Sequence, residues 1–124
     1  MKAILVGHGK MGAMIEQMLS RQADAELLGV VDAGLFERPQ EVPGRADVLI
    51  DFSHPDNLPM ILDFARQSGC ALVLGTTGYG PEQTAAIRKA AERAAIVHSS
   101  NYSLGVAVLK KAVALAAPLL MDAG

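Results

Sequence analysis

The sequence has little cysteine and little net charge. Its one cysteine, Cys70, cannot form an internal disulfide bond, and its place before the apolar segment 71–74 predicts a small buried hydrophobe. A lone reduced cysteine fits a cytoplasmic location. The formal net charge is −2, and lysine and arginine are scattered along the chain. This distribution excludes the basic stripe that is typical of nucleic-acid-binding proteins.

Long uninterrupted hydrophobic runs are also missing. The apolar run after Lys2 has the length of a strand and is too short for the hydrophobic region of a signal peptide. The most apolar segment, 104–121, carries Lys110 and Lys111 at its centre and Pro118 near its end, which disfavours a membrane span. No repeat is visible, and no set of cysteine, histidine and carboxylate residues has ligand spacing. We therefore expect no metal site.

The segment KAILVGHGKMG organises the rest of the chain. Its apolar half, 3–6, predicts a buried strand, and it is followed by the pattern GxGxxG and a helical segment, 13–19. Gly7 permits a tight turn, Gly9 lets the backbone approach a pyrophosphate, and Gly12 lets the helix and strand pack closely. The helix N-terminus would face the anion. Strand, glycine turn and helix in this order predict a dinucleotide site.

An acidic residue completes this motif. The next predicted strand, 26–31, ends at Asp32, which lies 20 residues past Gly12, where a carboxylate accepts hydrogen bonds from the adenosine ribose. A negative charge about 4 Å from a 2′-phosphate costs on the order of 1 to 4 kcal/mol, so Asp32 favours NADH. Lys10 and Arg38 would offset part of this repulsion. NADPH therefore remains a second possible cofactor.

Predicted strands and helices alternate along the whole chain. The predicted strands are 3–6, 26–31, 47–52, 71–74 and 95–97, and the predicted helices begin at 13, 55, 81 and 104 and end near 21–24, 68, 93 and 117. A polar, mobile loop is expected at 33–45. Apolar strands that alternate with helices predict an α/β fold, a doubly wound, Rossmann-type parallel sheet with helices on both faces. At 124 residues the chain forms one domain, 1–124.

The loops after these strands carry a family resemblance. In a doubly wound sheet these loops lie along one edge, where ligands bind. The motifs GKMG, DFSHP, GTTGY and SSNYSLGV, in this order, resemble 4-hydroxy-tetrahydrodipicolinate reductase, also called dihydrodipicolinate reductase, of bacterial lysine and diaminopimelate biosynthesis. The resemblance covers nearly the whole chain. It implies hydride transfer from NADH or NADPH to a cyclic dicarboxylate imine, in a protein that is a homo-oligomer at full length.

The resemblance also implies the residues of the cofactor site. The glycine loop would hold the pyrophosphate, and Asp32 would hold the adenosine ribose. Phe52 and Ser53 would flank the cofactor, and the loops 75–77 and 99–102 would contact its nicotinamide half, with Thr77 also reaching the substrate. The implied cofactor-binding residues are Gly7, His8, Gly9, Lys10, Met11, Gly12, Asp32, Phe52, Ser53, Gly75, Thr76, Thr77, Ser99, Ser100, Asn101 and Tyr102. His54 is interpreted as a helix-entry residue and His98 as a structural histidine.

We expect no catalytic residue in this chain, because none of its titratable residues is a convincing proton donor. The family's substrate domain, with its His-His pair and lysine, would begin beyond Gly124. The predicted last helix is apolar nearly all round, so we expect segment 104–121 to be a linking helix that packs against further protein or a second copy.

Three other interpretations stay open at this stage. The chain could be the cofactor domain of another amino-acid dehydrogenase, or a non-catalytic dinucleotide-binding redox sensor. The least specific interpretation is a doubly wound domain that binds no nucleotide.

Overall fold

The computed structural model describes residues 1–32 and 35–98, which form a parallel sheet with helices on both faces. The strands are β1 (Lys2–Val6), β2 (Glu26–Val31), β3 (Val48–Asp51), β4 (Ala71–Leu74) and β5 (Ile96–His98). Their order is β2-β1-β3-β4-β5, and every pair is parallel. The predicted doubly wound fold is confirmed. The bounds of β2 and β4 agree with the prediction, and the ends of the other strands shift by one residue.

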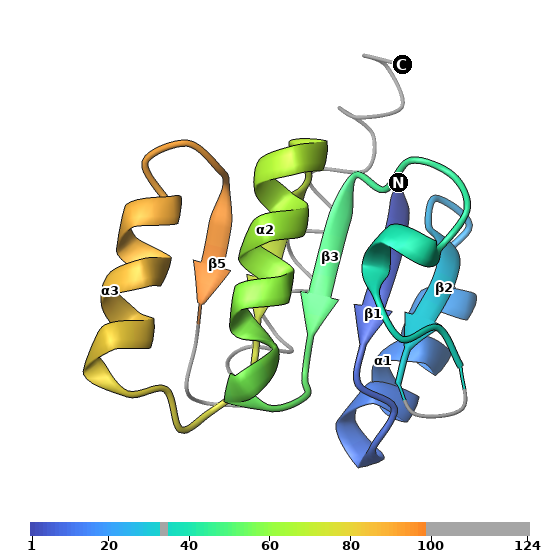
Figure 1. Ribbon diagram of the computed structural model, residues 1–124. Helices are drawn as coiled ribbons and strands as arrows, with labels where there is room; N and C mark the ends of the chain where they lie inside the picture. Colours follow the sequence, from blue (N-terminus) through green and yellow to red (C-terminus); the bar gives the residue numbers. More distant parts are fainter. Residues whose placement is uncertain (33–34, 99–124) are drawn as a thin grey trace.

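Within residues 1–32 and 35–98, three α-helices cover the two faces of the sheet. Helix α1 (Lys10–Ser20) lies on one face, and α2 (Leu58–Ser68) and α3 (Pro81–Ala90) lie on the other (Figure 1). The arrowheads of the strands point to one edge, so the loops that follow them are neighbours there (Figure 1). The topology therefore gathers the sequence motifs along one side of the domain.

The central strand β1 is buried on both of its faces. Ile4 belongs to the core cluster under α2 and α3, whereas Leu5 belongs to the cluster under α1. Successive side chains of a strand point to opposite faces, which explains this division. A strand covered on both sides has no place for polar residues, and its sequence is correspondingly apolar from Ala3 to Val6.

The helix ends differ from the prediction by a few residues. Helix α1 begins at Lys10, so that Gly12 lies inside its first turn, and it ends at Ser20. Helix α2 follows a 3₁₀ turn, η2 (Pro55–Asn57), and ends at Gly69, as predicted; Gly69 has the left-handed conformation. Helix α3 ends three residues early, because 91–94 continue as a hydrogen-bonded turn.

The loop after β2 is less polar than predicted. Among its described residues, Phe36 pairs with Val31 in an isolated bridge, and Val42 is only 5% exposed. Phe36 and Val42 join the core cluster under α2, and a short 3₁₀ helix, η1 (Pro39–Glu41), lies between them. The prediction of a polar loop was wrong for Phe36 and Val42, because these two apolar residues pack over Gly29 of β2 and join the core.

Cys70 is buried, as predicted, and burial raises the pKa of its thiol above the ordinary value. Within residues 1–32 and 35–98, no helix has the length and apolar character needed to cross a bilayer. The predicted linking helix, 104–121, and the candidate site residues Ser99, Ser100, Asn101 and Tyr102 lie outside the described residues.

Candidate functional site

The turn from β1 into α1 is built on main-chain contacts that only glycine permits. Gly7 has a φ of 97°, and a Cβ atom there would lie 2.5 Å from the carbonyl oxygen of Phe52. A Cβ atom on Gly12 would lie 2.1 Å from the carbonyl oxygen of Gly7. Gly9 instead faces open space, with no neighbouring atom within 4 Å of an added Cβ. The turn and packing roles expected of Gly7 and Gly12 are thus present, and the backbone at Gly9 is accessible.

Asp32 joins the end of β2 to this turn. One of its carboxylate oxygens accepts a hydrogen bond from the His8 backbone N–H at 2.6 Å. The Gly7 N–H donates to the carbonyl of Val31 at 2.9 Å, which adds a second link. The His8 imidazole is paired with the carboxylate of Glu16 on α1. The His8 side chain therefore holds the loop against its own helix.

A crevice of about 240 Å³ opens where the strand order reverses at β1. Ligands of open α/β sheets bind at this point. Its lining includes the predicted site residues Gly7, Asp32 and Ser53 and two residues that the sequence did not indicate, Glu37 and Asn57. Glu37 was not predicted as a site residue, because no local sequence pattern shows that the loop after β2 folds back beside Asp32.

Asp51, at the end of β3, is fully buried and surrounded by hydroxyl groups. One carboxylate oxygen accepts hydrogen bonds from the hydroxyls of Thr76 at 2.8 Å and of Tyr79 at 3.4 Å. The other accepts the Ser53 hydroxyl. Burial raises the pKa of the Asp51 carboxyl above its ordinary value, and the hydrogen bonds from Ser53, Thr76 and Tyr79 oppose that shift. Burial also raises the pKa of Tyr79.

Sequence reasoning did not single out Asp51. The signal was present, because a carboxylate ends an otherwise apolar strand, VLID. A buried carboxylate is stable only where hydrogen-bond donors surround it. The donors come from residues 2, 25 and 28 positions away, so only the fold brings most of them together.

Phe52 lies between the loops that follow β1 and β4. Its carbonyl oxygen approaches Gly7, and its ring occupies the space beside Gly75, where an added Cβ would lie 2.2 Å from a ring carbon. Phe52 is 8% exposed. This position explains why the chain has glycine at both of these loops.

The two threonines of the GTTGY motif have different surroundings. Thr76 is 1% exposed, and its hydroxyl accepts the Ser53 backbone N–H at 2.9 Å while donating to Asp51. Thr77 is half-buried, and its hydroxyl makes no hydrogen bond with another described residue. Thr77 is therefore the threonine of this pair whose side chain has a hydroxyl available to a ligand.

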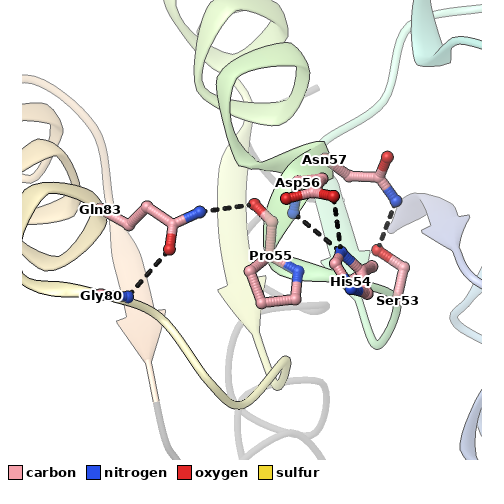
Figure 2. Close-up of polar contacts among 7 residues, drawn as sticks. All are labelled: Ser53, His54, Pro55, Asp56, Asn57, Gly80 and Gln83. Carbon is pink, nitrogen blue, oxygen red and sulfur yellow. Dashed lines mark hydrogen bonds and ion pairs between the residues drawn. The ribbon is translucent and has the colours of Figure 1, made fainter.

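The loops after β3 and β4 are also tied together on the side of α3. The Gln83 side chain donates to the carbonyl of Pro55 at 3.0 Å and accepts the Gly80 N–H at 2.9 Å (Figure 2). Within the loop after β3, the Asn57 amide donates to the Ser53 hydroxyl at 3.0 Å (Figure 2). The loop after β3 is thus linked to the loop after β4 through Gln83 and is closed internally by Asn57.

The remaining candidates lie around this framework. Lys10 is exposed at the first position of α1, and Met11 is half-buried beside it. His54 is exposed and accepts the Asp56 N–H, as expected of a helix-entry residue. His98 meets the Tyr79 ring edge-on, with 5.3 Å between ring centroids. The described part of the chain holds no group of three or more histidine, cysteine or carboxylate residues suited to a metal.

Comparison with solved structures supports the fold. A dipicolinate-bound dihydrodipicolinate reductase from Paenisporosarcina sp. TG-14 matches with a TM-score of 0.66 and 22% identity over 94% of this chain and 53% of that one. An engineered D-amino acid dehydrogenase bound to NADP+ matches with a TM-score of 0.57 and 21% identity, over 94% of this chain and 42% of that one. At these identities the likeness concerns the fold alone.

Sequence comparison identifies the family. The 4-hydroxy-tetrahydrodipicolinate reductase of Alkaliphilus oremlandii is 34% identical over 93% of this chain and 47% of its own length. That of Xanthomonas euvesicatoria is 41% identical over 91% of this chain and 54% of its own length. The chain thus spans about half the length of the curated relatives it matches. Residues 1–102 match the family model described as dihydrodipicolinate reductase, N-terminus, and the chain belongs to this family.

Proposed function

We propose that the chain is the NAD(P)H-binding half of a cytoplasmic 4-hydroxy-tetrahydrodipicolinate reductase, an enzyme that reduces a cyclic dicarboxylate imine in lysine and diaminopimelate biosynthesis. The observation that carries this proposal is the crevice where the strand order reverses, lined by Gly7 and Asp32. We infer the reaction from the relatives, which are 4-hydroxy-tetrahydrodipicolinate reductases. The substrate site, the proton donor and the contacts of a homo-oligomer would belong mainly to the half that this chain does not span.

The first turn of α1 fits a pyrophosphate. Gly9 is the N-cap residue and supplies no side-chain hydrogen bond, and the first turn contains no acidic residue. The N–H groups at a helix N-terminus have no partners within the helix, and the helix dipole attracts negative charge there. The accessible backbone at Gly9 leaves room for the phosphates to approach.

The strand order supports a proposed placement for each half of the dinucleotide. Asp32 follows β2 and would accept hydrogen bonds from the adenosine ribose. Because β3 and β4 lie on the other side of β1, the nicotinamide half would extend along Phe52, Ser53 and the loop 75–77. The bound cofactor supplies the hydride. In this arrangement Thr76 would contact the ligand through its main chain, and Thr77 would present its hydroxyl to the carboxamide or the substrate.

Binding of NADH tests the proposed function. We expect the chain to bind NADH in a calorimetric or fluorescence titration and Asp32→Ala to weaken binding by about tenfold, because a charged hydrogen-bond acceptor is lost. Asp63→Ala removes an exposed carboxylate on α2 and is the matched control, with no expected effect. Circular dichroism checks that each variant is folded. A folded wild-type chain that binds neither NADH nor NADPH would contradict the proposal.

The preference between NADH and NADPH follows from the charges of the crevice. Asp32 and Glu37 both line it, and both would repel a 2′-phosphate. We therefore expect NADH to bind about tenfold more tightly than NADPH at low ionic strength, where screening is weak. Glu37→Gln should lower the ratio of NADH affinity to NADPH affinity, and Lys10→Ala should raise it. Lys89→Ala, on α3, is the matched control for Lys10→Ala.

Two outcomes would contradict this explanation of the cofactor preference. An unchanged ratio of NADH affinity to NADPH affinity in Lys10→Ala would show that Lys10 does not contribute to the preference. Tighter binding of NADPH than of NADH by the wild-type chain would refute the carboxylate argument as a whole.

A further inference from the structure

The buried Asp51 carboxylate has no role in the function proposed so far. It is 0% exposed, and so it cannot contact the cofactor directly. Its hydrogen-bond donors nevertheless come from two loops of the proposed cofactor site, Ser53 after β3 and Thr76 after β4. Tyr79 adds a longer contact from the same β4 loop. A charge in this position is costly to bury unless such donors satisfy it.

Asp51 fixes the direction of two hydroxyl protons. The Thr76 oxygen accepts the Ser53 backbone N–H at 2.9 Å, so its single proton is left to bond Asp51 at 2.8 Å. The Ser53 oxygen accepts the Asn57 amide at 3.0 Å, so its proton likewise bonds Asp51. An ionised carboxylate only accepts hydrogen bonds and can therefore orient both hydroxyls at once.

We propose that Asp51 is a positioning residue that joins the β3 and β4 loops through Ser53 and Thr76 and so shapes the nicotinamide half of the cofactor site. This inference rests on the proposed function. Because the Thr76 hydroxyl is committed to Asp51, the Thr77 hydroxyl is the one of the pair that remains available to the ligand. Asp51 acts only through these neighbours. Its loss therefore weakens the binding of the nicotinamide half of the dinucleotide more than the binding of the adenosine half.

Asp51→Asn is a suitable probe because it preserves the side-chain volume. The amide presents one acceptor oxygen and one NH₂ donor, so one of the two hydroxyls loses its acceptor and must turn. We expect NADH affinity to fall about tenfold, as for loss of one charged hydrogen bond. Affinity for ADP-ribose, which lacks only the nicotinamide ring, should change less than about twofold. Asp47→Asn, at the opposite end of β3, is the matched control and should change neither affinity.

A second pair of variants tests the same link without altering the charge. Thr76→Val removes the hydroxyl and should weaken the binding of NADH more than the binding of ADP-ribose. Thr76→Ser keeps the hydroxyl and should retain the NADH affinity of the wild type. Equal weakening of NADH and ADP-ribose by Asp51→Asn and Thr76→Val, or no weakening of either, would overturn the positioning role alone. A folded wild-type chain that binds neither ligand would overturn the proposed function and this inference with it.

Discussion

Gly12→Ala should destabilise the domain and abolish measurable NADH binding, with an affinity loss of at least about 100-fold. Alanine within a helix usually stabilises it by about 1 kcal/mol relative to glycine. Here the sign reverses, because the added Cβ would lie 2.1 Å from the Gly7 carbonyl oxygen. The Gly7 oxygen belongs to the main chain and the position of the Cβ is fixed by the main chain, so the clash is relieved only by moving α1 or the glycine turn. Overpacking of this kind costs about 1–3 kcal/mol, which urea unfolding would measure.

Gly9→Ala is the matched control for the measurement of stability. An alanine Cβ at position 9 meets no atom within 4 Å, and Gly9 has an extended backbone that alanine adopts readily. Its stability should stay within about 0.5 kcal/mol of the wild type. Its NADH affinity should still fall, because the methyl group fills the space proposed for the pyrophosphate. Wild-type NADH affinity in a folded Gly12→Ala variant would refute the close-packing role of Gly12.

Gly75→Ala should have the second large effect, through the ring of Phe52. The added Cβ would lie 2.2 Å from a ring carbon, and the ring is 8% exposed and held between two loops. We expect the free energy of unfolding to fall by about 1–3 kcal/mol. NADH affinity should fall as well, because the displaced ring and the loop of Thr76 both border the proposed nicotinamide half.

A compensating substitution separates this clash from other causes. Phe52→Leu keeps the site apolar but removes the ring carbons that Gly75→Ala would strike. The double variant Gly75→Ala/Phe52→Leu should therefore be more stable than Gly75→Ala alone, although Phe52→Leu is destabilising by itself. Additive losses in the two substitutions, measured by thermal unfolding, would show that the ring is not the obstacle.

Local sequence patterns predicted the fold well because parallel strands leave strong signals. The strands β2 and β4 are largely apolar runs that are followed directly by Asp32 and Gly75, and their predicted bounds agree with the structure. Gly12 was interpretable for a similar reason, since its close contact with Gly7 lies within one strand-turn-helix unit, whereas the contact of Gly7 with Phe52 depends on the loop after β3.

Features that depend on distant parts of the chain were not predictable in this way. The environment of Asp51 depends mainly on the pairing of β3 with β4, which brings Thr76 to it from 25 residues away. The packing of Phe36 and Val42 against the core depends on how the loop after β2 returns to the sheet. For Asp51 the residue type suggested a surface position, and for Phe36 and Val42 the polar residues around them in the loop did; the tertiary contacts bury Asp51 and Val42 and pack Phe36 against the core.

The burial of Cys70 gives the domain a built-in reporter of its own opening. This is the only thiol in the chain, it is 3% exposed, and burial raises its pKa, so both access and thiolate formation are suppressed in the folded state. A thiol reagent reacts with such a group mainly during transient unfolding of the region around it. The rate of labelling at saturating reagent therefore measures how often α2 and β4 separate, without any introduced probe.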